Sequence, residues 1–278
     1  MNEQISSSTG SDSSLRLAVV STTIILVMFG LIIAAYFLYR HRGKLLNPGK
    51  KKGDFLETFD DGTIDPKLVI VENGAASHSV NGGELFFDQT TSVSDAHVWY
   101  YDVPLDLSRP FVARVRTKTD NYVVSGGIAC NPLVLYINGT QKPRILGGST
   151  LEEGFIITYM EPSGGRTYVV FMDNLDGHCW WNFTTDAWAS SEPPANEMCR
   201  PMDVKSYATL EFWSTPKSFY FRLLDKNGKL LYKTAPKVWS DFSQLLRGAD
   251  VYLSGGEWLS SWLSNDEWID YIQVKYER

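Results

Sequence analysis

The sequence has few cysteines, three in 278 residues, at positions 130, 179 and 199. A small, odd number excludes the dense disulfide framework of a small secreted domain. Cys179 and Cys199 enclose a 19-residue loop and could pair in an oxidising compartment, which would leave Cys130 unpaired. Histidine is also scarce, and no closely spaced pairs of His and Cys complete four ligands, so we expect no structural zinc site.

Several chemical motifs are missing as well. The sequence contains no G-x-S-x-G nucleophile elbow. Its glycine-rich segments at 125–127 and 147–149 lie between predicted strands and not before helices, so we expect no phosphate-binding loop. The formal net charge of −6 argues against a nucleic-acid partner, because such a partner requires a broadly basic surface.

One long run lacks charge entirely. Leu17 to Tyr39 holds 23 residues between Arg16 and Arg40. At about 1.5 Å per residue this is roughly 34 Å of helix, enough for a hydrocarbon core of about 30 Å. A signal peptide usually has a shorter apolar core with its basic residues in front, whereas here the basic residues follow. The run predicts a single transmembrane helix at 17–39, in contact with the lipid bilayer, after a polar tail at 1–16.

The charge distribution predicts the orientation of this helix. Residues 1–52 carry seven basic and two acidic side chains, a net of +5, which leaves 19 basic and 30 acidic residues, a net of −11, in the remainder. The basic neck at 40–53 favours the cytoplasmic side for everything that follows it. The extracellular side is the alternative. Asn138 and Asn182 begin glycosylation sequons, but so short a pattern often arises by chance.

Residues 54–278 alternate between short apolar runs and turns rich in Gly, Pro, Asn and Asp. This pattern, with almost no helical periodicity, predicts an antiparallel β-sandwich or barrel. Asn227-Gly228 predicts a type I′ hairpin turn, and Ser240 to Arg247 predicts one short helix that ends at Gly248 in the left-handed conformation. The predicted strands are 68–71, 84–88, 97–102, 111–117, 122–130, 133–138, 155–160, 168–173, 207–213, 219–225, 230–234 and 251–254.

The last segment, 266–278, reads DEWIDYIQVKYER and alternates with period two. Counting by twos from Trp268 places Asp270 on the apolar face with Ile272, Val274 and Tyr276. A carboxylate there usually accepts hydrogen bonds from backbone amides, because an unpaired buried charge is costly. We therefore predict a strand in which Asp270 has a structural role.

Residues 54–88, 110–120 and 266–274 together resemble the concanavalin A-like jelly roll. They contain a G-E-L-x-F strand and a closing W-I-D-x-I-x-V strand. The resemblance implies an all-β antiparallel jelly-roll β-sandwich over 54–278, behind the transmembrane helix. This group includes lectins, laminin-G-like domains and glucanases. Its glucanases use E-x-D-x-E or E-x-D-x-x-E on one strand, with carboxylates at about 5–5.5 Å for retaining hydrolysis. No such motif is present, so we expect no catalytic residues.

Two aromatic clusters are candidate binding surfaces. The first lies before Pro193-Pro194, in a long loop of the kind that is often functional, and the second follows Gly255-Gly256. Tryptophan beside amides and carboxylates suits a protein partner, a carbohydrate, or a loop folded over the core. The candidate residues are Trp180, Trp181, Asn182, Trp188, Trp258 and Trp262. Asp173, Asn174 and Asp176 are candidate calcium ligands through their oxygen atoms, although such a run is more often a turn.

These observations favour a membrane-anchored binding or structural protein that is not an enzyme and docks a protein partner. A minor capsid or scaffold protein of a virion with an internal membrane is one setting that fits this topology. The alternative is a cell-surface lectin or adhesin that binds carbohydrate, and a membrane-bound glycoside hydrolase is the third hypothesis. The sequence does not identify the partner.

Overall fold

The computed structural model describes residues 53–88, 96–120, 127–145, 154–161, 168–173, 175, 179–257 and 266–277. The predicted transmembrane helix and polar tail lie outside these ranges, as does nearly all of the neck. Within the described ranges, no helix has the length and apolar character needed to cross a bilayer.

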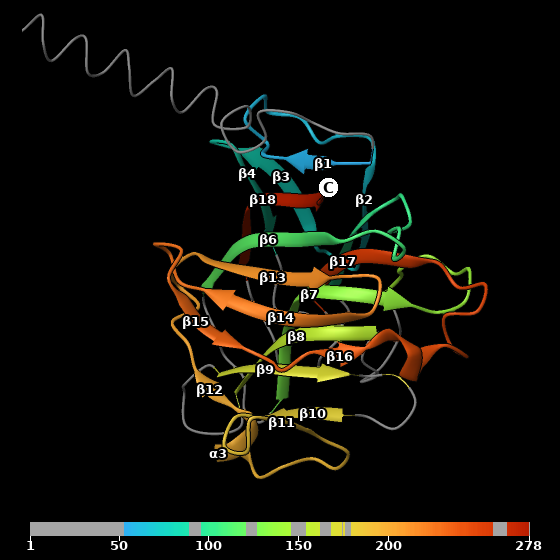
Figure 1. The fold of residues 1–278 in the computed structure, drawn as a ribbon. Coiled ribbons are helices and arrows are strands. Elements are labelled where there is room, and N and C mark those ends of the chain that lie inside the picture. Colours follow the sequence, from blue (N-terminus) through green and yellow to red (C-terminus); the bar gives the residue numbers. More distant parts are fainter. Residues whose placement is uncertain are drawn as a thin grey trace, which may run out of the picture. The chain divides into compact units, whose positions relative to one another are not determined.

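The described residues form an antiparallel sandwich of two sheets, as predicted (Figure 1). Sheet A has the order β15-β14-β13-β6-β18-β4-β3, with β1 beside β18 and β16 beside β14. Its strands are β1 (Phe55–Glu57), β3 (Ser77–Asn81), β4 (Glu84–Asp88), β6 (Phe111–Asp120), β13 (Ala208–Ser214), β14 (Ser218–Leu224), β15 (Leu230–Lys233), β16 (Lys237–Val238) and β18 (Asp266–Tyr276).

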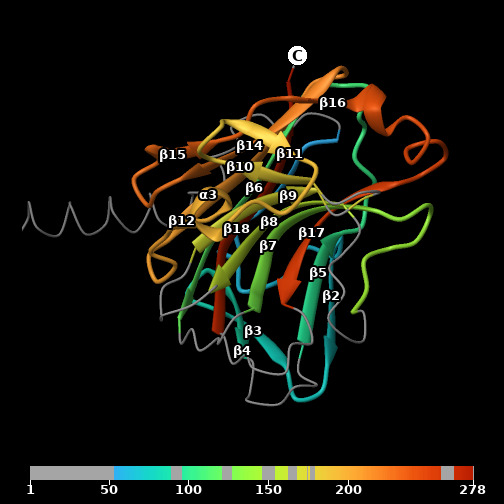
Figure 2. The ribbon, with the colours of Figure 1, turned by 90° about the horizontal axis from the view of Figure 1, so that it is seen from below.

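Sheet B has the order β11-β10-β9-β8-β7-β17-β5-β2, with β12 beside β9, and Figure 2 shows its β7, β17, β5 and β2 in succession. Its strands are β2 (Leu68–Asn73), β5 (Ala96–Tyr101), β7 (Gly127–Ile137), β8 (Gly154–Glu161), β9 (Tyr168–Asp173), β10 (Cys179–Asn182), β11 (Ala187–Ala189), β12 (Arg200–Pro201) and β17 (Val251–Glu257). Two short helices complete the described elements, α3 (Ala195–Met198) and the 3-10 helix η1 (Trp239–Phe242).

The core lies between the sheets because alternate residues of each strand point inward. Aromatic rings fill much of it: Phe155 of sheet B packs on Phe219 of sheet A with ring centroids 4.3 Å apart, and Trp239 lies 4.3 Å from Phe219. Trp99, Tyr159 and Phe171 are also fully buried. Burying side chains of this size stabilises the domain by about 1.5–3 kcal/mol each before the ordering costs are counted.

The final strand corrects the predicted facing of Asp270. The register between β18 and β6 shifts between Ile269 and Tyr271, so Asp270 occupies a β-bulge. The bulge adds one residue, and the inward positions are therefore Glu267 and Ile269 before it and Ile272 after it. Asp270 is instead partly exposed and forms an ion pair with Arg116 at 3.3 Å. The predicted inward orientation was wrong because simple alternation cannot detect an inserted residue.

The β14–β15 hairpin occurs where it was predicted, but its turn is different. Only Gly228 of the predicted Asn-Gly pair has a positive φ, 79°, so the turn is not type I′. The Asp225 carboxylate accepts hydrogen bonds from the backbone amides of Asn227 (2.8 Å) and Lys229 (2.9 Å). This Asx arrangement favours an ordinary turn followed by one left-handed glycine.

Two further boundaries differ from the sequence prediction. The segments predicted as 122–130 and 133–138 contribute to one strand, β7, with a register shift between Cys130 and Leu133. Pro132 lies inside this shift and has no amide hydrogen to donate, which explains the irregularity. The predicted helix at 240–247 is the 3-10 helix η1 followed by turns, although Gly248 is left-handed as expected, with φ of 73°.

Candidate functional site

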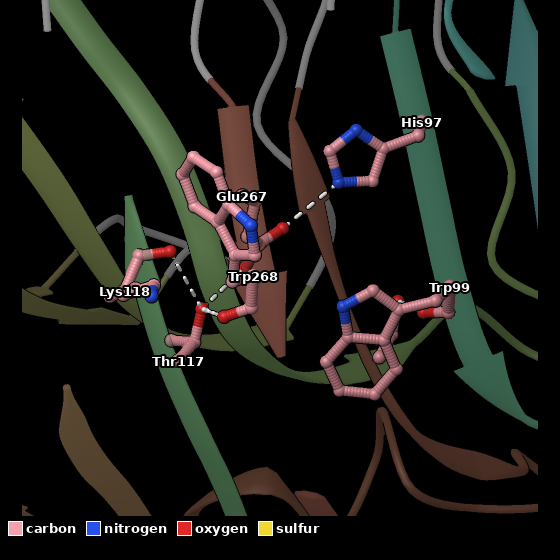
Figure 3. Close-up of polar contacts among 7 residues, drawn as sticks. His97, Trp99, Thr117, Lys118, Glu267 and Trp268 are labelled. Atoms are coloured by element: carbon pink, nitrogen blue, oxygen red, sulfur yellow. Dashed lines mark hydrogen bonds and ion pairs between the residues drawn. The ribbon is translucent and has the colours of Figure 1, made fainter. Parts of the chain in front are cut away.

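A buried polar network links the two sheets (Figure 3). His97 of β5 and Glu267 of β18 form a hydrogen bond between Nε2 and Oε2 at 2.9 Å, and their side chains are only 0% and 1% exposed. Thr117 Oγ1 lies 3.0 Å from Glu267 Oε1 and 2.9 Å from the backbone oxygen of Trp268. The ring of Phe87 stacks on His97 at 3.7 Å. Solvent does not reach this carboxylate, and the network joins the two sheets.

Of the six predicted binding residues, the structure describes Trp180, Trp181, Asn182 and Trp188, and these four do not share one exposed surface. Trp181 is fully buried and packs against Trp188 with ring centroids 5.5 Å apart. Trp180, the preceding residue, points to the opposite side of β10 and is half-buried. Trp188 is half-buried, donates Nε1–H to the Ala235 oxygen at 3.3 Å, and lies under the Lys237 ammonium. Trp258 and Trp262 lie outside the described residues.

Asn182 has a local structural role. Its Oδ1 accepts hydrogen bonds from the amides of Thr184 (2.8 Å) and Thr185 (3.0 Å), and its Nδ2 donates to Glu197 Oε2 at 2.7 Å. These three bonds fix the turn after β10 and tie it to α3. The side-chain nitrogen to which a glycan would attach at this sequon is therefore engaged in the folded domain.

Asp173, one of the weak calcium candidates, is bound by a cation of the protein. Its Oδ2 accepts a hydrogen bond from Lys237 Nζ at 2.7 Å, and its Oδ1 accepts one from the Leu175 amide at 3.0 Å. Asn174 and Asp176 lie outside the described residues. No group of three or more potential metal ligands occurs among the residues that are described. The calcium site stays a prediction.

The outward face of sheet B carries an aromatic and apolar row. The strand registers align, in order, Val69, Tyr100, Ser254, Val134, Ile156, Met172 and Trp180. Met198 of α3 and the adjoining Cys199 pack with Trp180 at one end of this row. Near the other end, Tyr252 lies two residues before Ser254 on β17, and its ring meets Tyr100 edge to face with centroids 6.2 Å apart.

Charged groups surround these two tyrosines. Asp102 follows β5 directly and forms an ion pair with Lys142 Nζ at 2.5 Å. Asp250 precedes β17, and its Oδ2 accepts a hydrogen bond from the Tyr252 hydroxyl at 3.3 Å. The Asp250 amide donates to the Gly139 oxygen at 2.8 Å, which holds β17 beside the segment that carries Lys142. We call these five residues, Tyr100, Asp102, Lys142, Asp250 and Tyr252, the tyrosine–aspartate site.

The electrostatics of this site follow from its geometry. Burial, and then the nearby Asp102 carboxylate, raise the pKa of Tyr100 above its usual value. Burial, and then Asp250, do the same to the pKa of Tyr252. The hydrogen bond to Asp102 raises the pKa of Lys142. At neutral pH the phenols are therefore neutral and the ammonium is protonated. Tyr100 and Tyr252 are only 6% and 4% exposed, so they lie beneath a charged rim that is 30% exposed at Asp102 and 51% at Lys142.

This set of groups suits a polyhydroxylated ligand. The carboxylates of the rim can accept hydroxyl hydrogens, and its ammonium can donate to hydroxyl oxygens. Sequence reasoning missed the site because its members come from positions 100–102, 142 and 250–252. One signal was present: an outward tyrosine lies two residues from an aspartate at the end of β5 and again at the start of β17.

The thiols of Cys179 and Cys199 are both free in the structure. Burial raises the pKa of Cys199 to about 11. Because the thiolate is the reactive form, we predict that iodoacetamide at pH 8 alkylates Cys199 in the folded protein at least tenfold more slowly than the same cysteine in urea. Cys179 is half-exposed and serves as the internal reference, and peptide mass spectrometry gives both rates. Rapid labelling of Cys199 in the folded chain would contradict its buried position.

The two sheets, their antiparallel order and the aromatic core define a class: a lectin-like, concanavalin A-like jelly-roll β-sandwich. Solved structures of that class superpose on this chain. Peanut lectin matches at 9% identity over 81% of this chain and 98% of its own, with a TM-score of 0.53. The seed lectin of Lotus tetragonolobus matches at 11% identity over 81% and 99%, with a TM-score of 0.51.

Part of a longer chain shares the architecture too. The Bacteroides ovatus protein described as Xyloglucan PUL GH43B matches at 10% identity, with a TM-score of 0.52, over 80% of this chain and 39% of its own. No protein-family model and no curated protein matches the sequence. At these identities the similarity shows the fold, and the ligand must be argued from the site.

Proposed function

We propose that the domain is a non-catalytic carbohydrate-binding module whose ligand lies on the tyrosine–aspartate site. The observation that carries the proposal is the convergence of two aromatic rings, two carboxylates and one ammonium from three chain segments on the outward face of sheet B. A lectin-like fold agrees with this function without establishing it, because the same fold also supports enzymes.

The rim of the site gives the sharpest test. We predict that Asp102→Ala and Lys142→Ala each weaken binding of a sugar identified on a glycan array by about tenfold or more. A lost hydrogen bond to a charged group costs about 1.5–3 kcal/mol, and 1.4 kcal/mol corresponds to a tenfold change in Kd. Isothermal titration calorimetry measures the affinities. Both side chains are partly exposed, so the substitutions leave the fold intact.

Glu72→Gln is the matched control. Glu72 of β2 forms another partly exposed contact, a hydrogen bond with His78 of β3 at 2.7 Å, and it is not part of the tyrosine–aspartate site. The control retains full affinity if the tyrosine–aspartate site binds the sugar. Equal losses of sugar affinity in all three variants would contradict the proposal, as would failure of the unaltered chain to bind any sugar. Release of reducing sugar from a β-glucan panel would favour the hydrolase instead.

We further propose that Leu17–Tyr39 anchors the domain in a membrane, supported by its length and lack of charge. The basic neck favours the cytoplasmic side, whereas a sugar ligand favours the glycan-bearing side. Protease protection of the domain in intact membranes measures which side it occupies. The capsid-scaffold hypothesis rests on topology alone, and neither the fold nor the site adds support to it.

A further inference from the structure

The outward face of sheet A differs from that of sheet B in its charge. Three adjacent register rows of outward residues cross β14, β13, β6 and β18 at its centre, and two of these rows extend to β15. With the bulge residue Asp270, the rows contain five cations, Arg114, Arg116, Arg222, Lys233 and Lys275, and two carboxylates, Glu211 and Asp270. The centre of this face is thus positive on a chain with a formal charge of −6. We call these rows the basic–aromatic face.

Glu211 holds the arginines of this face in place. It lies on the outward side of β13, yet only 4% of its side chain is exposed. Its Oε1 accepts a hydrogen bond from Arg114 Nε at 2.6 Å, and its Oε2 accepts one from Trp213 Nε1 at 2.6 Å. Arg222 Nε lies 3.4 Å from the same Oε2. A carboxylate bound in this way fixes two guanidinium groups on either side of one strand.

The aromatic rings add a second constraint. Trp213 and Tyr220 stack with an interplanar angle of 3° and centroids 6.2 Å apart. Arg114 and Arg222 lie over the Trp213 ring at 5.5 and 5.3 Å, and Lys233 lies over Tyr220 at 4.4 Å. The cations therefore have defined positions, as few surface lysines and arginines do, and their binding to an anion costs less side-chain entropy.

Donors remain for a ligand. Arg114 donates a hydrogen bond from Nε to Glu211 and another from Nη1 to Gln273 at 2.8 Å. Since a guanidinium carries five N–H groups, others remain that could donate to a ligand. Arg114 and Arg222 flank β13, so they stand two strand spacings apart, roughly 10 Å. Forked donors of this kind match carboxylate and sulfate groups with two parallel hydrogen bonds.

From this geometry we propose that the basic–aromatic face is a second ligand site that binds an acidic polysaccharide through its carboxylate or sulfate groups. A stiff chain with anions at regular intervals matches fixed cations better than fluid lipid headgroups or an unfolded acidic peptide, which would lose more entropy on ordering. A nucleic acid would stack its bases on open rings, but here cations and a neighbouring ring lie against the faces of Trp213. The site is independent of the tyrosine–aspartate site.

Binding of dextran sulfate and polygalacturonate to the full-length chain tests the proposal, with neutral dextran as the uncharged control. We expect both acidic polymers to bind and Arg222→Gln/Lys233→Gln to weaken them at least tenfold. Lys226→Gln/Lys229→Gln removes the same charge from the exposed turn of the same hairpin, outside the three rows, and should change affinity less than twofold. Arg222→Lys keeps the positive charge but loses the two parallel N–H donors of the guanidinium, so we expect an intermediate affinity.

Equal losses in the two double variants would show nonspecific charge attraction and overturn the proposal. Stronger binding to a poly-dT oligonucleotide or to phosphatidylserine vesicles than to either polysaccharide would also overturn it, as would failure to bind both polymers. Asp102→Ala should leave polyanion affinity unchanged. Failure of one site is therefore distinguishable from failure of the other.

Discussion

Replacing Glu267 with leucine is expected to lower the free energy of unfolding by about 3–5 kcal/mol. The substitution leaves His97 and Thr117 in the core without the carboxylate that both contact. Removing one partner of a buried pair is destabilising because the other partner stays buried without its interaction. Equilibrium unfolding in urea, followed by tryptophan fluorescence, measures the loss. The midpoint should move to lower urea concentration with little change in the slope.

Two variants separate this effect from a general effect on β18. Asp270→Asn changes a carboxylate three residues away on the same strand, but its ion pair with Arg116 is partly exposed, so we expect a loss of less than about 1 kcal/mol. The double variant Glu267→Leu/His97→Phe should be more stable than Glu267→Leu alone, because it removes both polar groups. A loss below 1 kcal/mol in the single variant would mean that the network contributes little.

Replacing Trp181 with alanine should cost about 3–5 kcal/mol, the usual loss for a large buried aromatic side chain. Its ring is fully buried between the sheets and packs on Trp188, so truncation leaves a cavity in the core. Thermal unfolding monitored by circular dichroism would show a melting temperature several degrees lower. Trp180→Ala is the control, because the neighbouring ring is half-buried on the outward side of β10.

Trp180→Ala should lose clearly less, about 1–2 kcal/mol, because less apolar surface is buried there. Comparable losses at the two positions would contradict the opposite facing of these residues. The comparison also distinguishes a core role of Trp181 from the ligand contact that the aromatic sequence cluster had suggested.

The sequence predicts most strands of this fold well and its irregularities poorly. The bounds predicted for β4 and β9 agree with the structure, since alternation and turn residues mark both ends. Asp270 was assigned the wrong side because a bulge changes alternation without any distinctive residue type. Similarly, the residues around Trp180 and Trp181 do not indicate which of the two side chains is buried. The pairing of β10 with its neighbouring strands decides which one enters the core.

The tyrosine–aspartate site depends even more on pairing. Asp102 and Asp250 are almost 150 positions apart, and they belong to one site because β17 pairs with β5. Such a site cannot be found by motif, since its spacing is set by the topology and not by a local chemical requirement. The basic–aromatic face arises in the same way, from alternate residues of strands that pair across the sheet.

The position of β18 has a consequence for biosynthesis. This strand contains residues 266–276, and it lies inside sheet A, between β6 and β4, with β1 also paired to it. Until residues 266–276 have left the ribosome, β4 and β6 each keep one edge that lacks its partner strand. Sheet A is therefore completed only after β18 has been synthesised, and a chain truncated before residue 266 would have two unpaired, aggregation-prone strand edges.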